Sequence, residues 1–200
     1  MPKQRTVKSR VEQKAVTREG LLRVARKVFT KYGYAETSVA DICRAARVTH
    51  GALYHHFAGK IDIFSAVVSE IFTTLAAAIQ SAADAETGWA QVEAAARAYL
   101  NACMDPTVQV ILLREAPTVL AQTEFKEADA TVNEPLVAGL MRRWIEMGIM
   151  RPLPLPDAAR ILGGAFAEAG AAIATAKDSA KARAEAEAVI HLLMAGLKAG

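Results

Sequence analysis

The 200-residue chain is 52% hydrophobic and contains only two cysteines, Cys43 and Cys103, without a C-x-x-C pair. This composition excludes a disulfide framework and a zinc knuckle and predicts a folded protein of a reducing cytoplasm. The formal net charge is +3, but residues 1–60 carry +9 and the remainder carries −6. A basic first part predicts a polyanionic partner for that part alone, although a basic tail with a solvated face would give the same charges.

The first 16 residues are basic and are not followed by an apolar stretch, which excludes a signal peptide on ordinary criteria. We expect this segment to be a disordered arm, and its positive charges are Lys3, Arg5, Lys8, Arg10 and Lys14. Such an arm could follow the minor groove or the phosphates of DNA, or it could be an idle soluble tail.

Residues 17–32 have apolar side chains at i, i+3, i+4 and i+7, which predicts an amphipathic helix that ends at Gly33. A two-turn helix is predicted to begin at Ser38, where Asp41 completes a capping box. An equally short helix is predicted to begin at Thr49. Two short helices joined by a tight turn have the spacing of a helix-turn-helix.

A long amphipathic helix is predicted from Lys60 towards Ala83, and it connects the two halves of the chain. Proline should kink or divide the helical region that contains Pro135, and Arg151–Pro156 should form a stiff connector. Five further helical regions are expected, at 88–104, 106–115, 123–148, 157–177 and 180–198.

No strand is predicted, so the fold class is all-α with about nine helices. Residues 17–62 are expected to form a three-helix DNA-binding domain, and residues 63–200 a helical ligand-binding and dimerisation domain. The most apolar segment, 158–176, contains two charged residues, so that no membrane span is expected and a cytoplasmic location is predicted.

The segment from Thr37 to Lys60, TSVADICRAARVTHGALYHHFAGK, resembles the DNA-binding signature of the tetracycline-repressor (TetR) family, and the resemblance extends over residues 17–68. It implies a recognition helix that presents its start to the major groove. By position, it assigns groove or phosphate contacts to Thr49, His50, Gly51, Ala52, Tyr54, His55 and Lys60. Two further DNA contacts are expected on the preceding helix, from Ser38 and Arg44.

The chemistry of these side chains agrees with such a role. Thr49 and His50 can donate to base edges or phosphates, and Gly51 allows the backbone to approach closely. Ala52 can meet a thymine methyl group. The ring of Tyr54 could instead pack beneath Phe57.

The same segment contains three histidines and a non-glycine residue in its turn. His50, His55 and His56 do not share a helical face as i, i+4 ligands do, so no metal site is expected. Arg47 stands in the turn where the family usually has glycine, and a left-handed conformation costs a non-glycine residue on the order of 1 kcal/mol. Either the turn tolerates this cost or its geometry differs, and the guanidinium could reach a phosphate.

The second half resembles one branch of the same family in the segments 110–120 and 162–168. A ligand pocket is expected among its helices, lined by residues that are bulky or polar within apolar helices. These candidates, each of which could instead be ordinary core, are Phe72, Trp89, Tyr99, Cys103, Arg114, Trp144 and Phe166. Arg114, if buried, would need Glu115, Glu168 or an anionic ligand as a partner.

Small side chains in residues 157–177 would let another helix approach closely, either from a second subunit or within the chain. Together with residues 180–198 they fit the four-helix dimer interface that the family resemblance implies. The residues predicted at that interface are Gly163, Gly164, Ala167, Gly170, Ala171, Ile190 and Met194.

We therefore predict a homodimeric transcriptional regulator that binds a palindromic duplex operator and is released by a small effector. Repression is the expected output, with activation as the alternative. No catalytic motif is present and no cofactor is expected, which disfavours a small helical enzyme. A ligand-independent architectural DNA binder is the third possibility, but about 130 residues after the DNA-binding part exceed what dimerisation requires.

Overall fold

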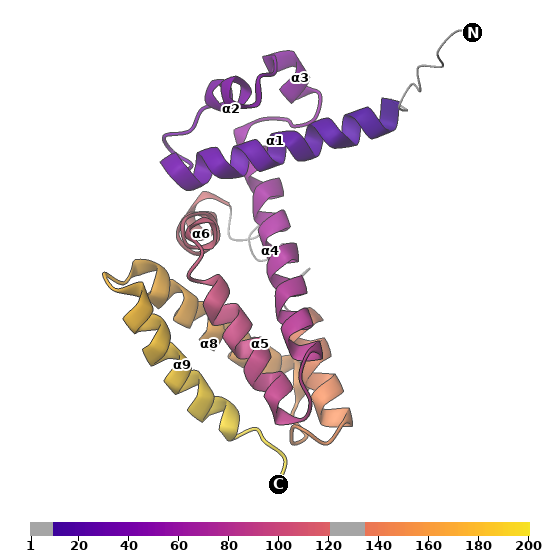
Figure 1. Ribbon diagram of the computed structural model, residues 1–200, viewed down its shortest axis with the longest axis vertical. Coiled ribbons are helices and arrows are strands. Elements are labelled where there is room, and N and C mark those ends of the chain that lie inside the picture. Colours follow the sequence, from indigo (N-terminus) through magenta and orange to yellow (C-terminus); the bar gives the residue numbers. More distant parts are fainter. Residues whose placement is uncertain (1–9, 121–134) are drawn as a thin grey trace, which may run out of the picture. The chain divides into compact units, whose positions relative to one another are not determined.

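The computed structural model describes residues 10–120 and 135–200, with side chains from residue 18, and within these ranges every element is helical (Figure 1). The only β-type pairing in this part of the chain is an isolated bridge between Met150 and Lys198. The predicted all-α class is confirmed. The elements are α1 (Arg10–Tyr32), α2 (Val39–Ala46), α3 (His50–Tyr54), α4 (Lys60–Asp84), α5 (Trp89–Ala102), η1 (Val108–Glu115), α6 (Ala116–Val119), a helical stretch at 135–146, α8 (Leu155–Thr175) and α9 (Ser179–Ala195).

Some predicted bounds were wrong. Helix α1 begins at Arg10, so the last part of the expected arm is helical. Helix α8 begins at Leu155, because Pro156 at its first turn lacks only an N–H that has no helical partner there. The kink expected at Pro135 falls beside residues outside the described ranges, and Pro135 itself opens the helical stretch.

The predicted helix at 106–115 is instead a π-helix, η1, which α6 follows directly. Pro117 lies in the first turn of α6. Since proline cannot donate a backbone hydrogen bond and crowds the preceding turn, it interrupts the α-helical ladder at this point. A π-helical turn is one way in which a helix accommodates such an interruption.

The chain divides into two compact units, Met1–Val67 and Val68–Gly200. In the first unit, the ring of Phe64 packs edge-on against Phe29 and Tyr34, with centroid distances of 5.1 and 4.9 Å. Leu21, Leu22, Ile42 and Leu53 complete a core with almost no solvent access. Within this unit α2 packs against both α1 and α3.

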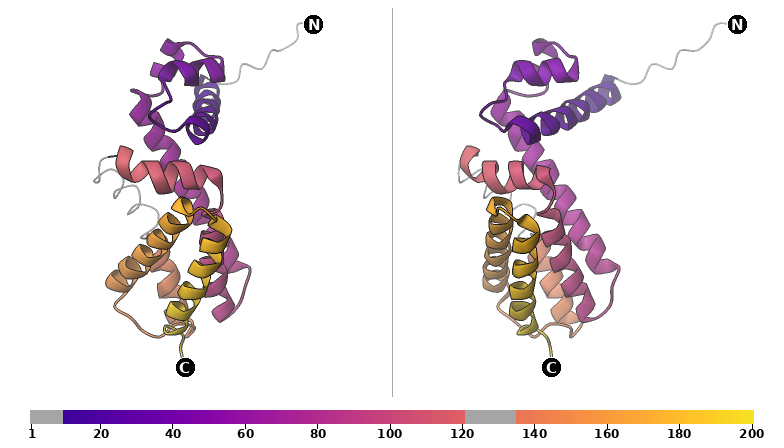
Figure 2. Two further views of the ribbon diagram at one scale, coloured as in Figure 1. Left: turned by 90° about the vertical axis from the view of Figure 1, so that its left-hand side faces the viewer. Right: turned by 60° about the vertical axis from the view of Figure 1, so that its left-hand side comes forward.

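In the second unit, α8 and α9 lie side by side and α5 packs against both (Figure 2). One hydrophobic cluster joins these helices to the stretch 135–146, and a buried hydrogen bond runs within it from Trp144 Nε1 to Gln91 Oε1 at 3.0 Å. A smaller cluster contains Leu100, Cys103 and Ile173.

Helix α4 is the one described helix whose length and apolar composition would allow it to cross a membrane. The sequence had instead pointed to residues 158–176 as the most apolar segment. The large apolar side chains of α4 are buried inside the protein, from Ile63 and Phe64 to Leu75. A buried core helix of a soluble protein satisfies the same criteria of length and composition.

Candidate nucleic-acid interface

Helix α2 begins with a complete capping box. Ser38 Oγ accepts from the backbone N–H of Asp41 at 3.1 Å, and Asp41 Oδ2 accepts from the backbone N–H of Ser38 at 3.0 Å. Asp41 also pairs with the exposed Arg44, with 2.8 Å between Oδ1 and Nη1. Hydrogen bonds from Ser38, with help from Arg44, lower the pKa of Asp41.

The turn between α2 and α3 is built on a left-handed residue. Arg47 has φ 57° and ψ 44°. Its N–H donates to the carbonyl of Arg44 at 3.3 Å, and the N–H of Val48 donates to the carbonyl of Cys43 at 3.0 Å, as in a Schellman motif. The sequence left open whether the turn tolerates arginine or has a different geometry. The structure shows the left-handed turn with arginine in place.

Helix α3 presents polar groups to solvent and one apolar residue to the core. Thr49 caps the helix, since its Oγ1 accepts from the N–H of Ala52 at 3.2 Å. Leu53 is fully buried, whereas Thr49, His50 and Gly51 are exposed and Ala52 is half-buried. The surface predicted to face the groove is therefore the exposed side of α3.

Tyr54 and His55 are exposed as well, and Tyr54 keeps 54% of its surface. Packing of the Tyr54 ring into the core beneath the buried Phe57 is thus not observed. A Cβ at Gly51 would meet nothing within 4 Å, so no crowding inside the chain requires glycine there.

Lys60, predicted to contact a phosphate, is partly engaged within the first unit. Its ammonium donates to the carbonyl of Tyr34 at 2.8 Å and lies 4.1 Å from the centroid of the Tyr34 ring. An ammonium has three N–H donors, so this contact does not exhaust it. Lysine at this position therefore also stabilises the fold.

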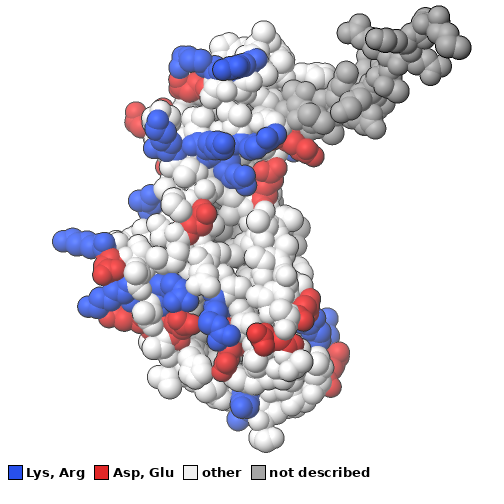
Figure 3. Space-filling model, viewed as in Figure 1, with Lys and Arg blue, Asp and Glu red and all other residues white. Residues whose placement is uncertain are grey.

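Positive side chains are numerous on the first unit, and Figure 3 shows a band of Lys and Arg along α1. Among the described side chains, no group of three or more His, Cys, Asp or Glu could hold a metal ion. His55 and His56 instead stack edge-on, with 5.3 Å between their ring centroids.

Three predicted pocket residues come together in the second unit, at the junction of α5, η1 and α8. Tyr99 and Phe166 lie edge-to-face at 5.3 Å, and Cys103 is fully buried nearby. A Cβ on Gly170 would lie 2.7 Å from the Tyr99 hydroxyl and 3.3 Å from Cys103 Sγ. Burial raises the pKa of the Cys103 thiol to about 11, against a smaller opposing effect of the Tyr99 hydrogen bond, so the thiol stays neutral.

The other predicted pocket residues lie elsewhere. Trp89 and Trp144 belong to the main hydrophobic cluster, and Phe72 is buried on α4. Arg114 is exposed on η1, which removes the need for a buried counter-charge. The sequence suggested burial because four apolar residues precede Arg114, but of these four only Ile111 and Leu112 are buried, while Leu113 is partly buried against the smaller cluster.

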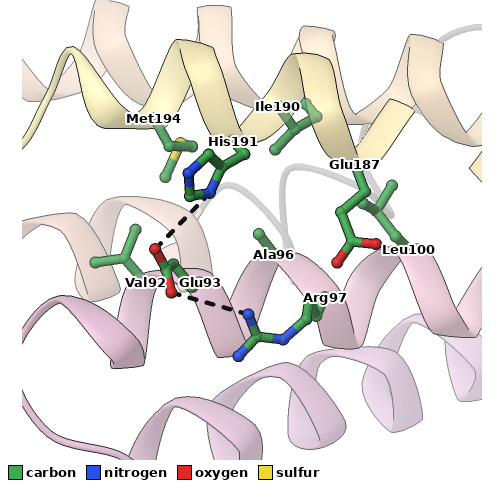
Figure 4. Close-up of a pocket in the computed structure, with 9 residues that line it drawn as sticks. All are labelled: Val92, Glu93, Ala96, Arg97, Leu100, Glu187, Ile190, His191 and Met194. Atoms are coloured by element: carbon green, nitrogen blue, oxygen red, sulfur yellow. Dashed lines mark ion pairs between the residues drawn. The ribbon is translucent and has the colours of Figure 1, made fainter. Parts of the chain in front are cut away.

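A small cavity of about 30 Å³ lies between α5 and α9 (Figure 4). Its floor is apolar, and its rim carries Glu93, which lies 3.9 Å from Arg97 and 3.8 Å from His191. Pockets for drug-sized ligands are roughly ten times larger or more. None of the predicted pocket residues lines this cavity, and its volume is suited to a water molecule.

Three residues predicted at the dimer interface face inward instead. Ile190 and Met194 line the α5–α9 cavity, and Gly170 is buried against Tyr99. Gly164 and Ala167 are exposed, and Gly163 and Ala171 are half-exposed. The sequence did not identify the apolar residues that α8 and α9 do expose: Ile161 (70%), Val189 (57%), Leu192 (74%) and Leu193 (52%).

An N-terminal helix-turn-helix followed by a separate helical unit defines a class of DNA-binding regulators. Residues 21–67 match the family described as "Bacterial regulatory proteins, tetR family", and residues 89–197 match "Tetracyclin repressor-like, C-terminal domain". The chain belongs to the TetR family and is a ligand-responsive, DNA-binding transcriptional regulator, as the sequence predicted.

Similar proteins agree with this assignment. A TetR-family transcriptional regulator from Pectobacterium atrosepticum is 32% identical, with a TM-score of 0.82 over 96% of this chain and 98% of that one. The Transposon Tn10 TetC protein of Escherichia coli is 25% identical over 75% of this chain and 76% of its own length. The regulator AcrR of Shigella flexneri is 45% identical, but over only 26% of this chain and 24% of its own length.

Proposed function

We propose that the protein represses transcription as a homodimer that binds a palindromic operator, with α3 of each subunit in the major groove. The observation that carries this proposal is the exposed side of α3, where Thr49, His50, Gly51 and Tyr54 face solvent. Thr49 caps its own helix, and its hydroxyl proton remains available to a base or phosphate. A helix of five residues makes few base contacts, so two copies are needed for a selective site. The DNA target would place the protein in the cytoplasm.

For the dimer interface we propose the exposed apolar face of α8 and α9. Ile161, Val189, Leu192 and Leu193 form its large side chains, and large exposed apolar groups gathered on one face mark an association surface. A Cβ at Gly163 or Gly164 would meet nothing within 4 Å among the described residues. Space therefore exists for the close approach of a second helix.

We place the effector site around Tyr99, Cys103 and Phe166. Tyr99 lies on α5, Cys103 directly follows that helix and Phe166 lies on α8. The π-helix η1 packs against the same place through Leu113. Such a lining suits an apolar effector with one group that hydrogen-bonds to the Tyr99 hydroxyl. The cluster is closely packed, so an effector must separate these helices, and binding that favours the separated state can lower operator affinity.

The first test is selection of bound sequences from a random duplex pool at about physiological salt, where non-specific phosphate binding is weak. A palindrome with two equal half-sites is the expected result. Recovery of no motif would contradict the proposal and favour an architectural DNA binder. A turnover assay would address the remaining enzyme alternative, which family membership disfavours.

Two variants then test the contacts. His50→Ala should change base preference, whereas Lys60→Ala should weaken binding to every sequence and reduce the salt dependence. Because Lys60 also binds Tyr34, the thermal midpoint of Lys60→Ala must be measured alongside. Arg142→Ala, at an exposed position of the second unit, is the charge control. Unchanged binding by both test variants would refute the assignment of α3.

A further inference from the structure

The α2–α3 turn contains the one non-glycine residue with positive φ among the described residues, Arg47. The other left-handed positions in that part of the chain are Gly33, Gly88 and Gly148. Glycine adopts this conformation without strain, whereas any L side chain is disfavoured in it. Arginine at this position is therefore retained against a conformational cost.

Nothing inside the described part of the chain accounts for the side chain of Arg47. The backbone N–H forms the turn, and glycine would form the same hydrogen bond. The guanidinium is exposed, and it makes no hydrogen bond or ion pair with any described residue. By contrast, Arg44 on the last turn of α2 is already paired with Asp41.

The position of Arg47 indicates what the guanidinium could meet. It lies two residues before Thr49, the cap of α3, so its side chain projects from the turn that leads into the exposed side of that helix. Strained residues that a fold retains often serve a binding function. Guanidinium is permanently charged and matches the geometry of a phosphate with two parallel N–H donors.

We propose that Arg47 binds a backbone phosphate of the duplex beside the groove that α3 enters, and that this contact is the reason for arginine in a left-handed turn. The inference rests on the proposed function, since it requires that α3 reads DNA. In this role Arg47 contributes to the position of the protein on the duplex and to its affinity for DNA. Base preference remains with the side chains of α3.

The experiment compares Arg47→Gly, Arg47→Ala and Arg47→Lys on two duplexes, the selected operator and a scrambled duplex of equal length. A phosphate contact acts on both duplexes. Loss of one contact in each subunit should weaken binding by about 3- to 10-fold and reduce the slope of log K against log salt by about 2 for a dimer. Arg47→Lys should keep most of the slope, because the charge remains.

Stability distinguishes a lost contact from a damaged fold. Arg47→Gly relieves the left-handed strain, so its thermal midpoint should rise by about 2–4 °C while its DNA binding weakens. Arg47→Ala keeps the strain and loses the charge, so it should bind as weakly as Arg47→Gly without that gain. The exposed Arg142 lies in the second unit, and Arg142→Ala should leave the salt slope unchanged.

The outcomes separate this inference from the proposed function. Failure of the wild-type protein to bind either duplex would refute both. Normal wild-type binding together with an unchanged salt slope in Arg47→Gly would refute the Arg47 contact alone. A loss as large in Arg47→Lys as in Arg47→Gly, or a lower thermal midpoint for Arg47→Gly, would also overturn it.

Discussion

The two units hold their polar side chains in different ways. Around the α2–α3 turn the partners are close in sequence. The Asp41 carboxylate accepts a hydrogen bond from the backbone N–H of Ser38, and the Thr49 hydroxyl accepts one from that of Ala52, three residues away in each case. The second unit has local pairs as well, such as Arg183 with Glu187, but it also has polar partners from distant segments. Trp144 forms a hydrogen bond with Gln91, which is 53 residues away in the sequence. Arg143 does so with Asp84, 59 residues away, and Arg183 with Asn101, 82 residues away.

This difference explains why the exposed side of α3 could be predicted and the burial pattern of the second unit could not. A local cap restricts which face of a short helix is buried, so the exposed residues follow from the pattern. A side chain whose partner lies on another helix depends on how the helices pack.

Substitution in the core of the first unit should cause the largest loss of stability. Phe64→Ala removes a fully buried ring that contacts Phe29 and Tyr34, and it should lower the free energy of unfolding by about 3–5 kcal/mol. Chemical denaturation measures the change. Tyr54→Ala, on the exposed side of α3, should stay within about 0.5 kcal/mol. Similar costs for the two variants would contradict the burial pattern.

The exposed face of α8 and α9 should control assembly. Leu192→Glu would place a carboxylate from each subunit in the proposed apolar interface, so the protein should become monomeric and operator affinity should fall by about 100-fold. Sedimentation and DNA titration provide the two measurements. Ala77→Glu adds the same charge at an exposed position of α4 and serves as the control. A Leu192→Glu protein that stays dimeric would exclude this face.

The buried hydrogen bond of the second unit should show long-range coupling. Gln91→Leu leaves the Trp144 N–H unpaired in the core, which should cost about 1–3 kcal/mol in urea denaturation. Trp144→Phe in the same background removes the unpaired donor. The double variant should therefore lose less than the two single losses combined. Additive losses would show that this hydrogen bond is not a coupled pair.

The N-terminal cap of α2 should contribute less to the free energy of unfolding than the buried contacts do. Ser38→Ala removes the side-chain acceptor for the Asp41 N–H and should cost about 1 kcal/mol of stability. Ser38→Thr keeps an acceptor and should retain most of it. If Ser38→Ala is neutral in stability but weakens DNA binding, the hydroxyl acts on DNA and its capping role is minor.

The smallest expected effect is on the loss of stability at acidic pH. Hydrogen bonds from Ser38 lower the pKa of Asp41, and hydrogen bonds from Gln80 and then Arg143 lower that of Asp84. A lowered folded-state pKa stabilises the protein above the ordinary Asp value of about 3.9, and this contribution is lost as the pH falls through the lowered pKa. Asp41→Asn and Asp84→Asn should each flatten the loss of stability in acid. An unchanged pH profile would contradict the shifts.

The amino-acid sequence by itself determined the helical class, the caps at Ser38 and Thr49, and the exposed side of α3. These features depend on hydrogen bonds and periodicity within a few residues, which any fold of this segment must respect. The sequence also located Arg47 in the turn, but only the backbone showed that arginine adopts the left-handed conformation.

Only the tertiary structure decided which faces of the later helices are buried. Helix α9 carries apolar residues on more than one side, so its pattern could not show that Ile190 and Met194 face α5 while Leu192 and Leu193 face solvent. The same ambiguity placed Arg114 in a core that it does not enter and failed to show that Gly170 packs beneath Tyr99. Burial in a helical bundle depends on neighbours far away in the sequence, and helix periodicity contains no information about which neighbours those are.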